Sequence, residues 1–487
     1  NLHRFLLELV VALESRTTCK CEGFIFDLGP HNVALMNQFG LSVKKGSNES
    51  SVQHPTDPAR ALQMIPDPTH AAKCFASALR RSDVTIPARF VTKYNLRSSV
   101  AKISNVQSLY NRQSKMDYKP GKQLTQSVLK PDHFETMNVK NATNLFSGDV
   151  TTSLDFIDIE KKDGKMSPMV FLLKQFERWT KLMTDTTWSK NDMDSFEADI
   201  KFLMEFSELI DEVVFKKARV RSQTGAVWST AGVIKKTREY FDIGFETVKT
   251  SRFNQNVLEN IFSQTDSFAL KPNASQFAYA LRAVTISQSF LKPVLGSSYP
   301  WDRDEERGIC FLDMLANLKD DEVYKDDDFS FFEDFAIPEI TIEGFFPDLL
   351  QANAFHIEIS SLFGSLVTTL ACEECRESLF EDIDSDQTKN DLKRMRLDRS
   401  KEPSKIGMVL VLKLEFLFKN LSQSHGLATS AFKDNFFEVA GLRINSSFHC
   451  KETTKHLTQK FFKMRLKKMN QRQVHARNKF ASKSMSK

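Results

Sequence analysis

Apolar side chains recur every three or four residues from Leu2 to Leu13, a spacing that places them on one face of a helix. The next apolar run, Glu22 to Asp27 (EGFIFD), is short, ends in the carboxylate of Asp27 and is soon followed by a Gly-Pro chain break. Helical spacing returns from Val33 to Phe39. The chain therefore opens with a predicted helix, strand, loop and helix, with Asp27 at the C-terminal end of the strand.

The pattern then changes from short elements to long helices. Polar residues at Lys44 to Gln53 predict a loop, and Ala61 to Pro66 predicts a second strand. From His70 to Thr247 the apolar spacing is helical. The clearest helices in this block and after it are predicted at Met169–Met183, Phe196–Phe215, Val233–Phe245, Asn256–Gln264 and Ser275–Val284, and near Leu362 and Leu412.

The length and composition are those of a folded protein with more than one domain. A chain of 487 residues exceeds a single hydrophobic core, so two or three packed units are expected. Hydrophobic residues make up 41% of the chain and charged residues 26%, which excludes wholesale disorder. No apolar run approaches the roughly 20 residues that cross a bilayer, so no membrane partner is expected. The seven scattered cysteines favour a reducing compartment.

Charge is distributed unevenly, although the net charge is only +5. Eight acids lie between Asp320 and Asp334, no acid follows Glu452, and eleven Lys and Arg residues lie between Lys455 and Lys487. Such a basic tail suits contacts with phosphate backbones, which release counterions. The alternative of a solvated, partly helical basic end stays open.

Asp27 and an acid on a distant helix are the residue types from which RNase H-like nucleases build a metal site. Clustered carboxylates hold two divalent ions that clamp the attacking and leaving oxygens of a phosphodiester. A strand-end Asp also serves as a cap or a surface acid, and a Glu on an amphipathic helix has the same alternative. The pattern alone does not decide between these roles.

Six segments, taken in their order along the chain, favour the metal-site interpretation: GFIFDLGPHN (23–32), HPTDPAR (54–60), PDPTHAAK (66–73), FETMNVKNATNLFS (134–147), NQNVLENIFSQ (254–264) and PNASQFAYAL (272–281). In this order they resemble the P element type DNA transposases, the THAP-domain transposase family. ACEECRESL (371–379) and the terminal FFKMRLKKMN (461–470) are similar to family segments as well, with less information in each.

The resemblance implies an α/β fold in which an RNase H-like core is interrupted by a large helical insertion and followed by a mostly helical C-terminal region. It implies the following division: the first part of the core at 1–69, the helical GTP-binding insertion at 70–247, the last part of the core at 248–300, the C-terminal region with its acidic loop at 301–454, and the basic tail at 455–487.

The resemblance also implies residue roles. Asp27 and Glu259 take the places of two catalytic, Mg²⁺-binding acids in DNA strand cleavage and transfer. Asp67 takes the place of a carboxylate that reads the guanine edge of GTP, Lys73 supplies positive charge to the nucleotide, and Asn138 is a weaker contact. Transposon ends and target DNA are the implied partners, the nucleus is the implied location, and a homodimer is among the assemblies that the resemblance allows.

The sequence departs from the family pattern in ways that bear on activity. In the family, the first catalytic aspartate lies on a strand upstream of the helix that opens this sequence. This sequence also lacks the family's N-terminal zinc-binding THAP module. Asn256 stands where the family has Asp, and Leu28 stands where Gly follows the strand Asp. We therefore expect a truncated or inactive transposase-like chain.

Two other classes remain open. One is a non-catalytic, domesticated or decayed relative that keeps GTP or DNA binding without chemistry, and the other is an unrelated helical scaffold. Upstream genomic sequence that encodes a strand Asp and a Cys/His-rich module would favour the enzyme.

Metal and phosphate motifs of other kinds are weak or missing. Cys372 and Cys375 have the spacing of zinc ligands but lack a second CxxC pair, and only His449 and Cys450 are further candidates in type. No GxxxxGK[ST] loop occurs, so a nucleotide site would not be a standard phosphate loop.

Overall fold

A computed structural model describes residues 2–41, 46, 49–132, 135–215, 220–266, 273–290, 342–346, 348–367, 370, 372–382, 401–425, 436–441, 450 and 452–466. The chain divides into two compact units, which are described separately. Unit 1 comprises Asn1–Asn111 and Gly121–Glu322, and unit 2 comprises Arg112–Pro120 and Val323–Lys487. The finer division inferred from the sequence stays a prediction, and its boundary at 300 lies outside the described residues, as does the acidic loop.

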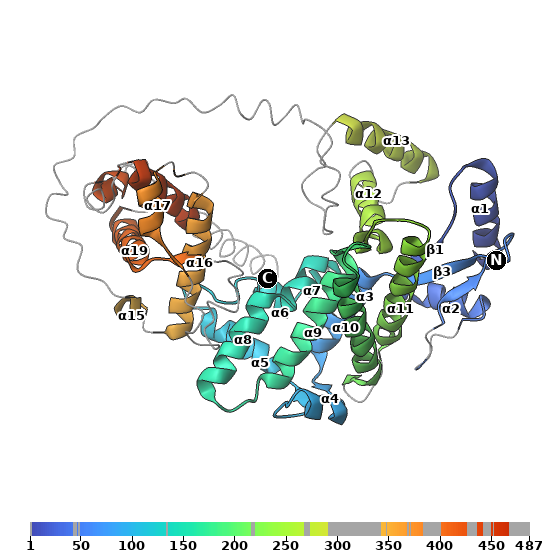
Figure 1. The fold of residues 1–487 in the computed structure, drawn as a ribbon, viewed down its shortest axis with the longest axis horizontal. Coiled ribbons are helices and arrows are strands. Elements are labelled where there is room, and N and C mark those ends of the chain that lie inside the picture. Colours follow the sequence, from blue (N-terminus) through green and yellow to red (C-terminus); the bar gives the residue numbers. More distant parts are fainter. Residues whose placement is uncertain are drawn as a thin grey trace, which may run out of the picture. The chain divides into compact units, whose positions relative to one another are not determined.

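Unit 1 begins with the following elements (Figure 1): α1 (Leu2–Arg16), β1 (Gly23–Phe26), α2 (Pro30–Gln38), β2 (Ser51–Gln53), β3 (Ala61–Pro66), α3 (Pro68–Arg81), β4 (Val84–Thr85), α4 (Ala88–Lys93), β5 (Val100–Ala101) and α5 (Ile103–Gln113), whose last two residues belong to unit 2. It continues with α6 (Gln126–Leu129), η1 (Glu135–Met137), α7 (Val139–Leu145), α8 (Gly148–Lys161), α9 (Ser167–Thr184), β6 (Thr187–Ser189), α10 (Met193–Glu212), β7 (Val214–Phe215), α11 (Arg221–Asp242), β8 (Thr247–Lys249), η2 (Thr250–Phe253), α12 (Asn256–Asp266) and α13 (Ala274–Phe290).

In its described residues, unit 2 is helical apart from one short strand pair. The elements there are α15 (Ile342–Phe345), α16 (Leu349–Val367), α17 (Glu373–Leu379), β9 (Phe380–Asp382), β10 (Lys401–Pro403), α19 (Lys405–His425) and helices over 436–441 and 452–466. Among the described residues of both units, no helix is long and apolar enough to cross a membrane.

The central sheet of unit 1 has the order β1-β3-β2. β1 runs parallel to β3, with Phe24 opposite Met64, and β2 pairs antiparallel with the other edge of β3. Because β1 and β3 are parallel, their carboxyl ends meet at one edge of the sheet. The N–H of Asp67 donates to the carbonyl of Phe26 at 2.7 Å, which places Asp67 beside the turn that begins at Asp27.

α11 packs closely against β3 because its facing side chains are small. A Cβ on Gly232 would lie 3.0 Å from Ile65 Cγ1, and one on Gly225 would lie 2.3 Å from Leu28 Cδ1. Ser229, between the two glycines, donates its hydroxyl to the carbonyl of Pro66. Small residues at these helix positions therefore set the distance between α11 and the strand that leads into the candidate site (Figure 1).

Two hydrophobic groups stabilise unit 1. Around the sheet, strand residues Phe26 and Met64 pack with Trp228 of α11 and with α2 residues Leu35 and Met36.

The second group fills the helical block and is aromatic. Phe75 of α3 lies 4.9 Å from Phe176 of α9, ring centre to ring centre, and Trp179 of α9 stacks on Phe206 of α10 at 5.2 Å. Aromatic pairs at such distances contribute about 0.5–1.5 kcal/mol beyond their buried area.

Unit 2 has its own core, centred on α16, α19 and the helix over 452–466. Phe355, Phe363, Phe418 and Phe461 are fully buried in it. The described part of the basic tail therefore belongs to a packed helix, whereas residues 467–487 lie outside the described residues.

Helices make up most of the described chain, with small mixed sheets. This agrees with the α/β character and the long helical block predicted from the sequence.

Candidate functional site

Asp27 directly follows β1, and its carboxylate is held by the turn that it starts. Oδ1 accepts hydrogen bonds from the N–H of Gly29 and from Asn32 Nδ2, both at 2.8 Å. A Cβ at position 29 would lie 2.9 Å from this Oδ1, so a larger residue there would displace the oxygen. Within the described residues Oδ2 accepts no hydrogen bond, and one carboxylate oxygen is left to act as a ligand.

Glu259 lies in the first turn of α12, and the residue that precedes this helix is tied to the sheet. Gln255 Nε2 makes a long hydrogen bond of 3.4 Å to the carbonyl of Ile25, and the Gln255 N–H contacts the Asp67 carboxylate. The N–H of Glu259 donates to the carbonyl of Gln255 at 2.9 Å. Glu259 therefore lies one helical turn from a residue held between β1 and Asp67.

Two amide side chains at the start of α12 are buried with unused hydrogen-bonding atoms. Within the described residues, Asn256 Oδ1 and Asn254 Nδ2 have no partner, although Asn254 Oδ1 accepts from the N–H of Asn256 at 3.0 Å. A buried polar atom without a partner costs about 1–3 kcal/mol. Asn256 Oδ1, one turn before Glu259, is thus a buried oxygen that a bound ion or molecule could contact.

Asp67 caps the N-terminus of α3 and is almost fully buried. Its carboxylate accepts the N–H of Thr69 at 3.0 Å. Burial raises the pKa of Asp67 to about 6, while the hydrogen bonds from Thr69, His70 and Gln255 and the charge of Lys73 oppose the rise. This carboxyl group therefore titrates near neutral pH and has a structural role as a helix cap.

A cavity of about 600 Å³ opens beside Asp67, along one face of α3 and at the start of α11. Asp67, His70 and Arg81 line it from α3, Arg221 lines it from α11, and Leu28 completes the wall. Burial, together with the charge of Lys73, lowers the pKa of His70, and the nearby charge of Asp27 opposes this shift. The cavity therefore combines a neutral imidazole, a carboxyl group and two guanidinium groups, and it has the size of a small-ligand site.

The three residues predicted to contact a nucleotide are not brought together in this cavity. Asp67 lines it, whereas Lys73 and Asn138 are not among its lining residues. Lys73 is buried on α3, and Asn138 caps α7 by accepting the N–H of Lys140 at 2.9 Å. The sequence reasoning missed Arg81 and Arg221. The signal for Arg81 was its spacing from Asp67, His70 and Cys74 on one face of α3.

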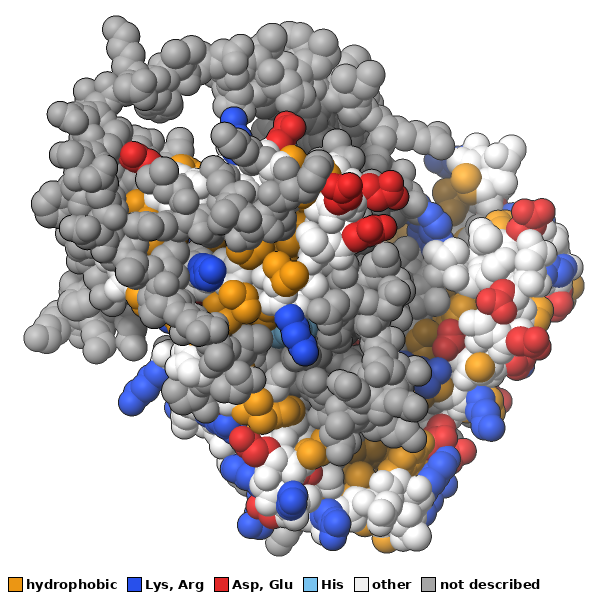
Figure 2. All heavy atoms as spheres, turned by 60° about the vertical axis from the view of Figure 1, so that its left-hand side comes forward, with side chains coloured by type: hydrophobic (Ala, Val, Ile, Leu, Met, Phe, Trp, Pro, Cys, Tyr) orange, Lys and Arg blue, Asp and Glu red, His pale blue; other side chains and the backbone are white. Residues whose placement is uncertain are grey.

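A second cavity, of about 730 Å³, lies against β1 and β3. It has apolar walls and includes the basic residues Lys20, Lys236, Lys249 and Arg252. Lys236 Nζ lies 2.6 Å from Glu22 Oε2, so part of this charge is neutralised inside the protein. On the face shown in Figure 2, basic and acidic side chains are interspersed over the described part of the chain, without a continuous basic stripe.

No protein-family model and no curated protein matches the chain. Among solved structures, it is similar to the Drosophila P element transposase strand transfer complex, with a TM-score of 0.50 and 19% sequence identity. The match covers 58% of this chain and 63% of that chain, which is less than two thirds of its length. The likeness shows that the matched part of the chain shares its fold with that transposase.

Proposed function

We propose that this chain is a P element transposase-like protein that binds DNA through an RNase H-like core and its basic C-terminal segment. One observation carries the proposal. In a chain with this fold, Gln255 at the start of α12 hydrogen-bonds to Ile25 of β1, which supports an arrangement with Asp27 and Glu259 at the same edge of the sheet. The proposal extends to a nuclear location, where the DNA substrate lies.

The residues at this edge fit Mg²⁺, which prefers oxygen ligands. Asp27 Oδ2 and the Glu259 carboxylate would hold the ion, and Asn256 Oδ1 offers a neutral oxygen nearby. The ion would supply positive charge to the oxygens of a phosphodiester. Asp27 is already oriented for this task, because Gly29 and Asn32 fix its other oxygen.

We further propose that this chain does not cleave or join DNA by itself. Among the described His, Cys, Asp and Glu residues, neither Asp27 nor Glu259 belongs to a group of three whose ligand atoms lie close enough to share a metal ion. Two-metal chemistry requires carboxylates on both sides of the ions, and Asn256 adds no charge. The protein would then act as a DNA-binding, non-catalytic relative of transposases, which is the second candidate function.

The 600 Å³ cavity is the place where we propose that GTP binds. Arg81 and Arg221 would contact phosphates, since guanidinium groups bind phosphate oxygens in pairs. The Asp67 carboxylate would accept hydrogen bonds from the guanine edge with the lone pairs that its helix cap leaves over. Lys73 would act through its charge on Asp67, and Asn138 would act indirectly through α7, which packs against α3.

Calorimetry with GTP and ATP tests the nucleotide assignment. GTP should bind more tightly than ATP, and Asp67→Asn should weaken GTP and improve the relative affinity of a xanthine nucleotide. Arg81→Gln should weaken both purine nucleotides equally, whereas Arg4→Gln on the exposed face of α1 is the matched control. Equal affinities for GTP and ATP in the unchanged protein contradict the assignment.

The main experiment incubates the chain with duplexes that carry candidate element ends, Mg²⁺ or Mn²⁺, and GTP. We expect a shifted protein–DNA complex and no cleaved or joined product. Metal-dependent products that vanish in Glu259→Gln would show a complete active site and overturn the non-catalytic proposal. Absence of any DNA complex at low salt would overturn the DNA-binding proposal.

A further inference from the structure

Three cysteines from separate parts of the sequence meet in unit 2. Cys372 directly precedes α17, Cys375 lies in its first turn, and Cys450 precedes the helix over 452–466. Their three Sγ atoms lie within 4.8 Å of one another. These three sulfur atoms are therefore close enough to share a metal ion. Among the described His, Cys, Asp and Glu residues, this group meets that condition.

The distance between two of the sulfurs distinguishes a metal site from a disulfide. Cys375 Sγ lies 3.6 Å from Cys450 Sγ. A disulfide requires about 2.05 Å, whereas two thiolates on one tetrahedral zinc ion, each about 2.3 Å from the metal, are about 3.8 Å apart. All three cysteines are thiols rather than halves of a disulfide. The arrangement is therefore that of ligands around a common centre.

We propose that Cys372, Cys375 and Cys450 bind one Zn²⁺ ion. Thiolates select soft or borderline ions, and a tetrahedral thiolate set is typical of zinc. Iron–sulfur clusters commonly use four cysteines, and the described residues offer three here. The fourth position is left to a water molecule.

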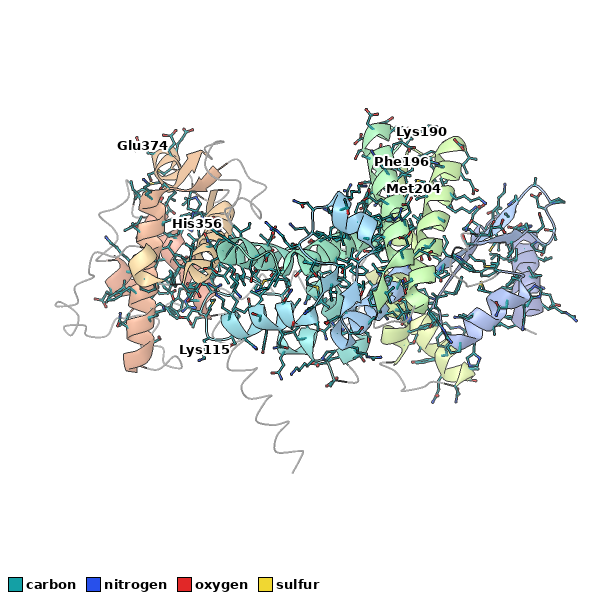
Figure 3. All side chains as sticks on the ribbon, turned by 90° about the horizontal axis from the view of Figure 1, so that it is seen from below. Lys115, Lys190, Phe196, Met204, His356 and Glu374 are labelled. Atoms are coloured by element: carbon teal, nitrogen blue, oxygen red, sulfur yellow. The ribbon has the colours of Figure 1, made fainter. Side chains whose placement is uncertain are left out.

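The surroundings of the sulfurs suit a structural ion. Cys375 is 1% exposed, and Cys372 and Cys450 are half-buried. Thr453 places Oγ1 2.9 Å from Cys450 Sγ, where its hydroxyl can donate to a thiolate and orient it. Glu374, which lies between the two cysteines of the CxxC segment and is labelled in Figure 3, is exposed.

The ion would join two segments that are 75 residues apart in sequence. Closing so long a loop removes conformational entropy from the unfolded chain, so a cross-link here contributes more than one between neighbours. The helix that Cys450 precedes buries Phe461 and Phe462 in the core of unit 2. Zinc would therefore hold this helix against α17, whether or not the protein acts on DNA.

Metal analysis of the full chain tests the proposal. Protein purified with reductant and without chelator, then dialysed against metal-free buffer, should retain about one zinc per chain, since structural thiolate sites bind tightly. Cys372→Ser and Cys450→Ser should each lower the zinc content at least tenfold. Cys19→Ser removes an exposed thiol in unit 1 and should leave the zinc content unchanged.

A footprint on the unchanged protein guards against variants that fail to fold. Alkylation followed by mass spectrometry should modify Cys372, Cys375 and Cys450 only after a chelator removes zinc, and should modify Cys19 in both states. Cobalt in place of zinc should give the intense visible bands of a tetrahedral thiolate site. The proposal fails if zinc is absent, if it persists in Cys450→Ser, if copper or iron occupies the site, or if the reduced protein contains a Cys375–Cys450 disulfide.

Discussion

Arg465 places Nε 2.7 Å from Glu415 Oε2 inside unit 2, where the two side chains are 4% and 0% exposed. Tyr118 Oη donates to the same oxygen at 2.6 Å. Burial raises the pKa of Glu415, and the positive charge of Arg465 opposes the rise. The ion pair therefore ties α19 to the helix over 452–466 and to the segment that contains Tyr118.

Arg465→Met should destabilise unit 2 by about 3–5 kcal/mol, because it leaves the Glu415 carboxylate buried without its partner. The double variant Arg465→Met with Glu415→Leu should recover most of this loss, since it removes both charges. Arg4→Met, which breaks the exposed pair with Glu8, should change stability by less than about 0.5 kcal/mol. Urea unfolding of the three variants measures these differences, and equal losses in the single and double variants would contradict the interpretation.

A truncation that tests DNA binding by the basic tail must keep Arg465, because Arg465 pairs with buried Glu415. Truncation after Leu466 removes seven Lys and Arg residues and leaves the buried pair intact. The slope of log affinity for duplex DNA against log salt should become less steep, by roughly 0.9 for each phosphate that the shortened chain no longer binds. Fluorescence anisotropy at several salt concentrations measures the slope. An unchanged slope would assign DNA binding to another surface.

Asp67→Asn should remove a pH dependence of stability. The folded pKa of about 6 lies above the ordinary value of 3.8, so the folded chain binds this proton more tightly than the unfolded chain. Stability from this group is therefore present at low pH and is lost as the pH rises from about 4 to about 6. The linked change is on the order of 3 kcal/mol.

Asparagine keeps the helix cap but does not titrate. The difference in unfolding free energy between Asp67→Asn and the unchanged protein should thus vary from pH 4 to pH 6 and become constant above pH 7. Asp67→Ala should be less stable than Asp67→Asn by about 1 kcal/mol at every pH, because neither side chain titrates and the cap is gone. A constant difference between the asparagine variant and the unchanged protein would contradict the raised pKa.

Asn256→Asp should increase metal affinity at the sheet edge. The new carboxylate would be buried one turn before Glu259. Without metal its charge is unpaired, so the melting temperature should fall in chelator, and bound Mn²⁺ should raise it again. Asn273→Asp is the matched control, because exposed Asn273 already caps α13 by accepting the N–H of Gln276 at 2.9 Å. Equal responses of the two variants to Mn²⁺ would place the metal elsewhere.

The parts of the fold with strong apolar periodicity were predicted well. α1, β1, β3, α9, α10 and α12 lie close to where the sequence places them. α11 begins at Arg221, twelve residues before the predicted Val233, because its first turns face β3 with small and polar residues such as Gly225 and Ser229. Such a face resembles a loop in a hydrophobicity pattern, although it is fully buried.

Other features depend on tertiary packing that the sequence does not encode locally. β2 occupies the end of the segment predicted as a loop, since three residues are too few for a period-two signal and their pairing with β3 determines the strand. The nucleotide prediction used a motif, whereas the cavity depends on which face of α3 meets α11. Cys450 was a candidate only by residue type, and folding brings it to the CxxC pair.

Leu28 connects the 600 Å³ cavity with the Asp27 carboxylate. It lies in the wall of the 600 Å³ cavity, it fills the space left by Gly225, and it is bonded to Asp27. A molecule in the cavity that moves the backbone at Leu28 would also move Asp27, whose carboxylate we propose as a metal ligand. Ligand binding in the cavity and metal binding at the carboxylate would then be coupled. Filling either site would change the affinity of the other site by the same factor.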